Sequence, residues 1–465
     1  MFFQDKGAKQ FALVLLVCHF SALLLLTAST AASWQIETID AGEGVGLYCA
    51  VAVDDSSNPH MSYGSDGESA LWHAKWGGSG WQTLAVDTSG QVGRHTSIVI
   101  DASGRPHISY LDYDSYDLKY ARWTDTEWEI QRVDSSPGVG EFTSIVIDDR
   151  GRPHIAYHAV SGLNLKYAIY VDGAWNVEIV DSPGMVGQYS SLALQFNSTP
   201  FISYRDASSQ DLKLARRKDS TWVIESPDTT GDVGVHTSIA IGKDGYPRIA
   251  HRRTGLGGVL FTVWNGAEWH TELVDGPTNV DREISLGLDS YDFPHLVYWD
   301  GGADALKHAY WDGSTWVIEI VDSQGERTGA FNDLALDRQN NVHIVYASFH
   351  DTLYVDSDLR YAKRDPTLVA ENARTEGGFQ LRLCQNSPNP FHLSTLISYS
   401  LPQASEVSLT IYDITGRLVE TLVDETQEPG IHQVRWNRKS NPSGVYFYCL
   451  SAGEFAETRK MVVVE

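Results

Sequence analysis

The sequence predicts an all-β protein, a seven-bladed β-propeller followed by a small immunoglobulin-like β-sandwich. Two periodic features predict the propeller: a tryptophan recurs every 47 residues, and an aspartate follows each one six residues later. The tryptophans are Trp34, Trp81, Trp128, Trp175, Trp222, Trp269 and Trp316, and the aspartates are Asp40, Asp87, Asp134, Asp181, Asp228, Asp275 and Asp322. A fixed period of this length, filled with short alternating apolar runs, is typical of one propeller blade per period. Six or seven short strands in the last stretch of the chain predict the sandwich.

One period reads as four antiparallel strands joined by tight turns. In the second period the expected strands, counted outward from the axis, are Thr96–Ile100, His107–Tyr110, Leu118–Trp123 and Trp128–Val133. The most apolar run is placed innermost because neighbours cover both of its faces. The tryptophan strand is then the outermost one.

This order leaves one strand over at the start of the repeats and three at the end. Trp34–Ile39 precedes every inner strand, and no tryptophan strand follows the last set. That last set comprises Leu334–Asp337, Val342–Tyr346 and Leu359–Lys363. We expect the N-terminal strand to complete the last blade and close the ring, which removes an open sheet edge.

Four segments are expected along the chain. They are a signal peptide at 1–32, the propeller at 33–365, a linker at 366–378 and the sandwich at 379–465. The first segment has two early lysines, an apolar run from Phe11 to Leu26 and small residues at its end, the pattern of a secretory signal. The run is short and lacks a basic flank, so no membrane span is expected in the mature chain. These features predict a secreted protein.

The charge and the cysteines narrow the classes of partner and scaffold. The formal net charge of −25 repels nucleic acid and permits neutral partners such as glycans. Only three cysteines follow the signal segment, too few for a disulfide-dense scaffold. Cys49 lies in an apolar strand and is expected to be buried. Whether Cys384 and Cys449 pair stays open, because the sequence does not show that they meet.

The repeated residues are interpreted as structural. Each tryptophan is expected to fill the wedge between blades, and each aspartate to accept backbone N–H groups of the next loop. A histidine follows a proline in five copies, and we interpret it as hydrogen-bonded rather than metal-bound, because the ring separates the copies. These histidines are His60, His107, His154, His295 and His343, and Phe201 and Arg248 replace them in two copies.

Differences between the copies point to a ligand-binding face. The loops entering each inner strand share one face with the loops between second and third strands, and by analogy this face binds ligands in propellers. The candidates there are Arg94, His95, Asp112, Tyr113, Gln188, Tyr189, Asp206, His236, Arg282, Glu283 and Asp300. Their aromatic, imidazole and polar groups suit stacking on a sugar and hydrogen bonding to it.

Metal and enzyme signals are weak. Asp112, Asp114 and Asp117 have a spacing that can hold Ca²⁺, but the loop lacks the glycine and distal glutamate of an EF-hand, and a solvated acidic loop is the simpler reading. No nucleophile elbow, zinc helix, P-loop or Cys-x-x-Cys motif occurs, so no catalytic residue is assigned. An arginine set for a carboxylated sugar can be drawn from four side chains, but no motif selects them. They are Arg94, Arg205, Arg252 and Arg282.

The tail has ordered motifs. They are Asn386-Ser387-Pro388-Asn389-Pro390-Phe391, Ile397–Pro402, Ile411–Arg417, Ser443–Tyr448 and Lys460–Val464. In these motifs the tail resembles the type A C-terminal sorting domain of the Por (type IX) secretion system, a family related to the immunoglobulin-like domain of flagellar hook-capping proteins. The resemblance implies export by the outer-membrane secretion machinery, with the tail as the address. The propeller resembles generic bacterial seven-bladed repeats.

Two functions are expected for the propeller. The first is a non-catalytic module that binds a glycan or a protein, for adhesion at the cell surface. The alternative is an extracellular polysaccharide hydrolase or lyase, with an acid/base pair drawn from loop carboxylates such as Asp112, Asp206 or Glu283. An enzyme needs two or three titratable groups converging in one pocket, whereas a binder needs aromatic and polar groups spread over a mouth.

Overall fold

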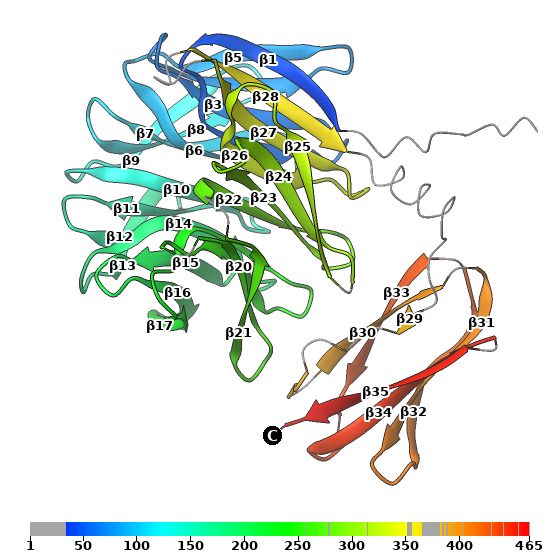
Figure 1. The fold of residues 1–465 in the computed structure, drawn as a ribbon. Helices are drawn as coiled ribbons and strands as arrows, with labels where there is room; N and C mark the ends of the chain where they lie inside the picture. The colour runs from blue at the N-terminus through cyan, green and yellow to red at the C-terminus, as the bar shows by residue number, and fades with distance from the viewer. Residues whose placement is uncertain are drawn as a thin grey trace, which may run out of the picture.

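The computed structural model describes residues 34–255, 257–277, 280–313, 315–350 and 356–364, and most of 382–464. Short gaps in the last range fall at 384–385, 387–388, 393, 402, 429, 440 and 454. The expected signal peptide and linker lie outside the described residues. Within the described ranges every regular element is a β-strand (Figure 1). No helix in this part is long and apolar enough to cross a membrane.

Residues 34–364 form seven antiparallel sheets of four strands each (Figure 1). Six sheets are built from consecutive strands. The first holds β2 (Val45–Val53), β3 (Pro59–Ser65), β4 (Ala70–Trp76) and β5 (Trp81–Asp87). The second holds β6 (Val92–Ile100), β7 (Pro106–Asp112), β8 (Asp117–Trp123) and β9 (Trp128–Asp134). The third holds β10 (Val139–Ile147), β11 (Pro153–Ala159), β12 (Asn164–Val171) and β13 (Ala174–Asp181).

The next three sheets repeat this plan. One holds β14 (Val186–Leu194), β15 (Pro200–Asp206), β16 (Asp211–Lys218) and β17 (Thr221–Asp228). The following one holds β18 (Val235–Ile241), β19 (Pro247–Arg252), β20 (Val259–Trp264) and β21 (Trp269–Asp275). The last holds β22 (Val280–Leu288), β23 (Pro294–Asp300), β24 (Ala305–Trp311) and β25 (Trp316–Asp322). The strand order within each period agrees with the order expected from the sequence.

The seventh sheet combines both ends of the repeat region. Its order is β1 (Gln35–Glu43), β28 (Asp356–Arg364), β27 (Val342–Phe349) and β26 (Glu326–Leu336). β1 pairs with β28 from Gln35 opposite Lys363 to Glu43 opposite Asp356. The tryptophan strand of the N-terminus therefore occupies the outer place of the last set, as expected.

Neighbouring sheets are joined along their inner strands by a repeated pair of hydrogen bonds. Thr143 Oγ1 donates to the carbonyl of His95 at 3.1 Å, and the amide of Ile145 donates to Ser97 Oγ at 3.2 Å. Between β26 and β2 the same places hold different groups: Cys49 Sγ donates to Phe331 O at 2.6 Å, and the Val51 amide donates to the Asp333 carboxylate at 2.9 Å. Cys49 is buried, as expected.

A second joint lies farther out and uses the repeated aspartate. Asp87 Oδ1 accepts the Ser89 amide at 2.9 Å, and its Oδ2 accepts the Tyr110 hydroxyl of the next sheet at 2.7 Å. The same tyrosine–aspartate bond recurs at five other joints, with distances of 2.6–2.7 Å. The tyrosines are fully buried, so each joint combines a polar bond with a large apolar contact.

The repeated tryptophans lie between adjacent sheets. Trp175 contacts Tyr120 of the preceding sheet edge-on, with ring centroids 5.1 Å apart, and its indole N–H donates to Gln131 at 3.0 Å. The proline-flanked histidines instead lie within one sheet. His107 Nδ1 is 2.5 Å from the Tyr120 hydroxyl, and its Nε2 is 3.4 Å from the Asp101 carboxylate.

The C-terminal part has two sheets. One contains β29 (Arg382–Leu383), β30 (Ser394–Leu401) and β33 (Gly430–Asn437). The other contains β32 (Leu418–Gln427), β31 (Ser405–Asp413), β34 (Gly444–Ala452) and β35 (Phe455–Val463). Both sheets contribute to one core around Trp436, Phe391 and Tyr448. Cys449 is a free thiol, and its candidate partner Cys384 lies outside the described residues.

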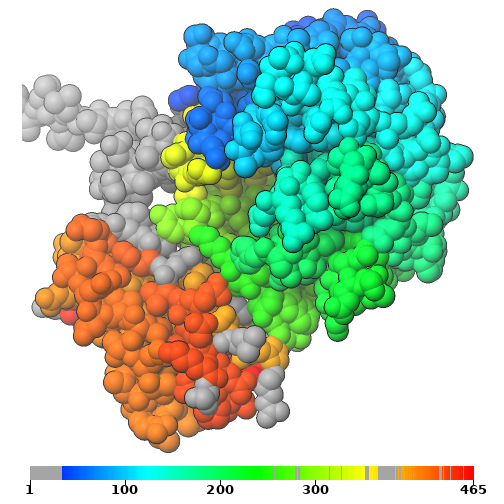
Figure 2. Space-filling view, turned by 180° about the vertical axis from the view of Figure 1, so that it is seen from behind, coloured from blue at the N-terminus to red at the C-terminus, as the bar shows by residue number. Residues whose placement is uncertain are grey.

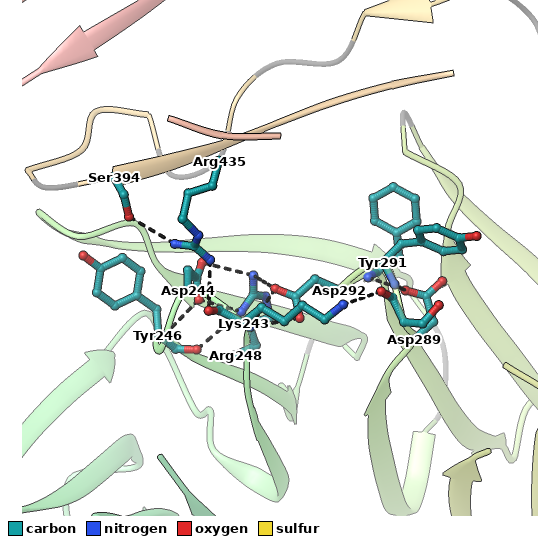
Figure 3. A network of polar contacts seen from close by, with 11 residues as sticks. Lys243, Asp244, Tyr246, Arg248, Asp289, Tyr291, Asp292, Ser394 and Arg435 are labelled. Atoms are coloured by element: carbon teal, nitrogen blue, oxygen red, sulfur yellow. Dashed lines mark hydrogen bonds and ion pairs between the residues drawn. The ribbon is translucent and has the colours of Figure 1, made fainter. Parts of the chain in front are cut away.

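The C-terminal part lies beside the propeller (Figures 1 and 2). Where the two parts meet, Arg435 of β33 donates to the carbonyl of Lys243 in the β18–β19 turn at 3.0 Å (Figure 3). Below this turn, Arg248 bridges Asp244 at 3.2 Å and Asp292 at 3.1 Å. Arg248 thus fills the place of the missing histidine and links two neighbouring sheets.

Candidate functional site

The entry into six of the seven inner strands has a local conformation that aims one side chain at the propeller axis. Tyr189 has a φ of 56°, and the equivalent residues of other copies have φ values of 50–54°. Gly187, two residues earlier, lies against the preceding sheet, since a Cβ there would be 2.7 Å from Leu165 Cα. The Val-Gly-x-x pattern therefore reflects a close approach that only glycine permits, followed by a left-handed residue. The residues equivalent to Tyr189 are Tyr48, His95, Phe142, His236 and Phe331.

These six rings form a continuous row around the axis. Neighbouring ring centroids are 4.2 to 4.7 Å apart, from Phe331 through Tyr48, His95, Phe142 and Tyr189 to His236. Glu283 stands in the seventh place, and its carboxylate accepts the Phe331 amide at 3.1 Å. The row is therefore aromatic except at one acidic position.

The row borders a cavity of about 150 Å³. The cavity is also lined by the residue that follows the ring position in six of the seven copies. This set is Cys49, Thr96, Thr143, Ser190, Thr237 and Ile284. Its four hydroxyls all bond a neighbouring carbonyl, as Ser190 does to Phe142 O at 2.7 Å. The groups that can form hydrogen bonds to a ligand therefore lie at the rim of the cavity rather than among these hydroxyls.

Charged side chains stand on the rim above the rings. The Glu141 carboxylate is 3.5 Å from the His158 ring, and Arg205 contacts Asp232 at 2.7 Å. Arg94 contacts Asp66 at 3.5 Å and lies over the Tyr113 ring, 4.0 Å from its centroid. Charged pairs therefore stand on the rim in three of the copies, and their composition changes from copy to copy.

Burial in the cavity wall and the charges on the rim shift the pKa values of His95 and Tyr189. Burial among packed rings lowers the pKa of His95 to about 4, although Glu141 opposes the shift. His95 opens partly to the narrow lumen, but protein atoms surround it, so it is neutral at pH 7. Burial also raises the pKa of Tyr189, with Arg205 and Arg252 acting against it. Both rings therefore offer uncharged, partly apolar surfaces to a ligand.

The structure brings together some of the residues predicted from the sequence. His95, Tyr189, His236 and Glu283 line the cavity. The Arg94–Tyr113 pair lies on the rim in the copy formed by β6–β9. Gln188 immediately precedes Tyr189 in β14. The side chain of Arg282 lies outside the described part.

The three predicted loop aspartates bond within their own copies. Asp112 accepts the amides of Asp114 and Ser115 and pairs with Lys119 at 2.8 Å. Asp206 accepts the amides of Ser208 and Ser209, and Asp300 pairs with Lys307 at 2.7 Å. Each aspartate stabilises a separate turn, so the three do not form one pocket with each other.

The carboxylates considered for calcium have protein partners as well. Asp117 pairs with Arg132 at 2.9 Å, and Asp114 accepts the Gln91 amide at 2.9 Å. Within the described ranges no group of three or more histidine, cysteine, aspartate or glutamate side chains has a metal-binding arrangement. Calcium at this loop stays a prediction.

Sequence reasoning missed three of the cavity rings, namely Tyr48, Phe142 and Phe331. Their signal was available as the second position after the repeated glycine, which is aromatic or histidine in six copies. Sequence reasoning also missed the tyrosine that bonds six of the seven repeated aspartates, although this tyrosine follows the aspartate at a nearly constant spacing. Both signals become visible only when the copies are aligned by strand.

Residues 387–464 match the family of secretion system C-terminal sorting domains. This match implies passage through the type IX secretion machinery to the cell surface or the extracellular space. No curated protein matches the chain in sequence.

Three solved structures are similar in fold. One is a protein of unknown function from Dyadobacter fermentans, at 11% identity over 71% of this chain and 99% of that chain, with a TM-score of 0.46. Another is PorZ, a surface component of the type IX secretion system of Porphyromonas gingivalis, at 12% identity over 90% and 68%, with a TM-score of 0.38. The third is the Dos1 propeller, at 8% identity over 71% and 95%, with a TM-score of 0.45. These likenesses concern the fold alone.

Proposed function

We propose that this protein is a secreted, non-catalytic binding module that recognises a glycan at the axial cavity of its propeller. The observation that carries the proposal is the row of six aromatic and imidazole rings around that cavity. Such rings offer flat apolar faces to a sugar, and the rim above them supplies hydrogen-bonding groups. The rim differs between copies, which suits a ligand without sevenfold symmetry.

The arrangement of carboxylates favours binding over hydrolysis. A glycosidase needs two carboxyl groups on opposite sides of one bond, within about 10 Å of each other. Asp112 and Asp206 instead stabilise turns in different sheets through their own loop amides. Hydrolase or lyase activity is therefore an outcome that the binding experiment tests, not the favoured function.

The test is a glycan array probed with the purified mature chain, with every bound glycan also analysed for cleavage products. We expect binding without turnover. Tyr189→Ala removes one cavity ring and is expected to weaken binding at least tenfold, as loss of a central aromatic contact does. Tyr291→Ala, in the β22–β23 turn at the opposite end of the strands, is the matched control and leaves binding unchanged. Turnover of any glycan, or equal binding by the Tyr189 variant, contradicts the proposal.

The organisation of the chain belongs to the same proposal. We propose cleavage of a signal peptide at 1–32, a propeller at 33–365 closed by its N-terminal strand, a linker at 366–378 and an immunoglobulin-like sorting domain at 379–465. The pairing of β1 with β28 and the bonds between β26 and β2 support the closure. Deleting residues 34–43 removes a strand ladder and Trp34, and an unchanged melting temperature would contradict the scheme.

A further inference from the structure

The set of strands β18–β21 departs from the other copies at the same end as the cavity. Arg252 stands at the position that Leu111, His158 and Arg205 hold in the three preceding copies, and Arg253 follows it where those copies have Asp112, Ala159 and Asp206. The following loop holds three glycines, Gly255, Gly257 and Gly258, with φ values of 74°, 70° and 128°. It contains no aspartate, whereas the equivalent loop after β7 contains Asp114. One sector of the rim therefore exchanges acidic groups for basic ones.

Strand register places two of these arginines beside the cavity rings. Arg205 of β15 is opposite Gln188, next to Tyr189, and Arg252 of β19 is opposite Val235, next to His236. The Tyr189 and His236 rings are themselves in contact, with centroids 4.2 Å apart. The charges of both arginines act on the Tyr189 hydroxyl. Two guanidinium groups therefore flank one pair of contacting rings.

The Arg205 guanidinium is held in place and keeps donors in reserve. Its side chain is 12% exposed, and it contacts Asp232 at 2.7 Å. Asp232 also accepts the Thr254 hydroxyl from the glycine-containing loop. Because a guanidinium has five N–H donors in a planar fork and Asp232 contacts one of its terminal nitrogens, Arg205 can also bind a further anion.

The surrounding charge makes this sector unusual. The chain carries a net charge of −25, so a free anion is repelled at long range. Salt limits that repulsion to about 8 Å at physiological ionic strength. An anion attached to a larger neutral ligand therefore reaches the sector once the rest of the ligand is bound.

We propose that the ligand is an acidic glycan, and that Arg205 and Arg252 bind the carboxylate of one sugar unit while Tyr189 and His236 contact its ring face. This inference rests on the proposed glycan-binding function and specifies its ligand class. The carboxylate provides the planar, two-oxygen geometry that matches a guanidinium fork. Arg205 and Arg252 are binding residues in this proposal, and Asp232 is a positioning residue for Arg205.

The experiment compares each acidic glycan with a neutral counterpart by calorimetry on the mature full-length protein. The probes are oligogalacturonate and its carboxyl-reduced form, and 3′-sialyllactose and lactose. We expect one acidic member to bind at least tenfold more tightly than its neutral counterpart, and the pair that does so distinguishes a uronate from a sialate. Arg252→Gln and Arg205→Gln are expected to remove this preference.

Two controls make the result specific. Arg216→Gln, on the third strand β16 and paired with Glu225, makes the same change in net charge away from the cavity and leaves the preference intact. Arg252→Lys keeps the charge but loses the fork, and is expected to retain only part of the preference. Thermal unfolding of each variant confirms that the fold is preserved.

The outcomes separate this inference from the proposed function. Equal binding of acidic and neutral glycans, still weakened by Tyr189→Ala, overturns the acidic ligand and leaves glycan binding standing. Binding of an acidic glycan that Arg205→Gln and Arg252→Gln leave unchanged overturns the assigned residues. If none of these probes and no arrayed glycan binds, both proposals fail.

Discussion

The sheet β6–β9 and the sheet β18–β21 each contact the preceding sheet at the same place in the repeat, but the two contacts use different side chains. At the first, Tyr110 donates to Asp87 at 2.7 Å and packs beside Ala121. At the second, His251 stands where the tyrosine is expected, 3.8 Å from Asp228, and bonds Thr262 at 2.8 Å. Thr262 replaces an alanine that is fully buried in the six other copies.

This comparison shows that paired substitutions can change the contact between one sheet and its predecessor while the sheet keeps the common order of four strands. A smaller ring, His251, accompanies a larger neighbour, Thr262, so the volume of the pair is roughly kept. The polar bond moves from between two sheets to within one sheet. The same copy carries Arg248 at one end and Arg252 at the other, so its departures extend along the whole second strand.

The largest expected effect is the difference in unfolding free energy between removing Asp87 and removing Asp228. Asp87→Ala leaves the buried Tyr110 hydroxyl without its acceptor and Lys119 without one of its two carboxylates, and is expected to cost about 3–5 kcal/mol of unfolding free energy. Asp228→Ala removes mainly the bond to the Thr230 amide and is expected to cost about 1 kcal/mol. Urea unfolding of both variants measures the difference. Equal losses would show that the two joints are energetically alike.

The next effect tests whether the histidine and threonine act as a pair. His251→Tyr alone introduces a larger ring against Thr262 and is expected to cost about 1–3 kcal/mol through overpacking. His251→Tyr with Thr262→Ala restores the common joint and is expected to recover that loss. A double-mutant cycle measures the coupling, which should exceed about 0.5 kcal/mol. Additive effects would mean that the two substitutions arose independently of each other's packing.

The pH dependence of stability sharpens the same contrast. Burial lowers the pKa of His251 to about 3, so the folded chain keeps it neutral while the unfolded chain binds a proton below about pH 6.5. Its contribution is therefore complete above pH 6.5 and falls as the pH decreases toward 3, by up to about 1.4 kcal/mol per pH unit. The His251→Tyr/Thr262→Ala variant lacks this group and should show a shallower slope in urea unfolding between pH 6.5 and 4. Parallel slopes would argue that His251 is not held neutral.

The smallest effect concerns the other end of the divergent copy, where Arg435 meets the Lys243 carbonyl (Figure 3). Arg435 is exposed, so Arg435→Ala is expected to change the unfolding free energy by less than about 1 kcal/mol. Arg417→Ala serves as the control, because Arg417 is an exposed arginine of the same C-terminal part and pairs with Asp413. Limited proteolysis of the linker compares the two variants, and faster cleavage of the Arg435 variant alone is the expected result.

The sequence predicts the frame of the fold better than its contacts. Strands with a strict period could be placed because hydrophobic alternation is local. The unpaired tryptophan strand at the start and the three strands left at the end predicted the pairing of β1 with β28. The hydrogen-bond partners of Asp87 could not be predicted from the sequence. Tyr110 lies in another sheet, and its bond to Asp87 depends on how the two sheets are rotated against each other. Likewise, the left-handed conformation at Tyr189 depends on the close approach of Gly187 to Leu165, which no local pattern reveals. His95, Tyr189 and His236 were found through the variation between copies, but Tyr48, Phe142 and Phe331 were not, because only the packed sheets bring all six rings to one cavity.

The inner bonds join residues that are one period plus one position apart, as Thr143 does with His95 and Ser190 with Phe142. Four copies therefore present a threonine or serine hydroxyl to a carbonyl of their predecessor, as Thr96, Thr143, Ser190 and Thr237 do. A gene that gains or loses one whole copy keeps every such donor matched to an acceptor, whereas a shorter insertion in an inner strand misaligns them. Tandem duplication in steps of one complete unit is thus the route by which a chain of this kind can lengthen, and a newly added unit is free to diverge while its neighbours keep their original interfaces.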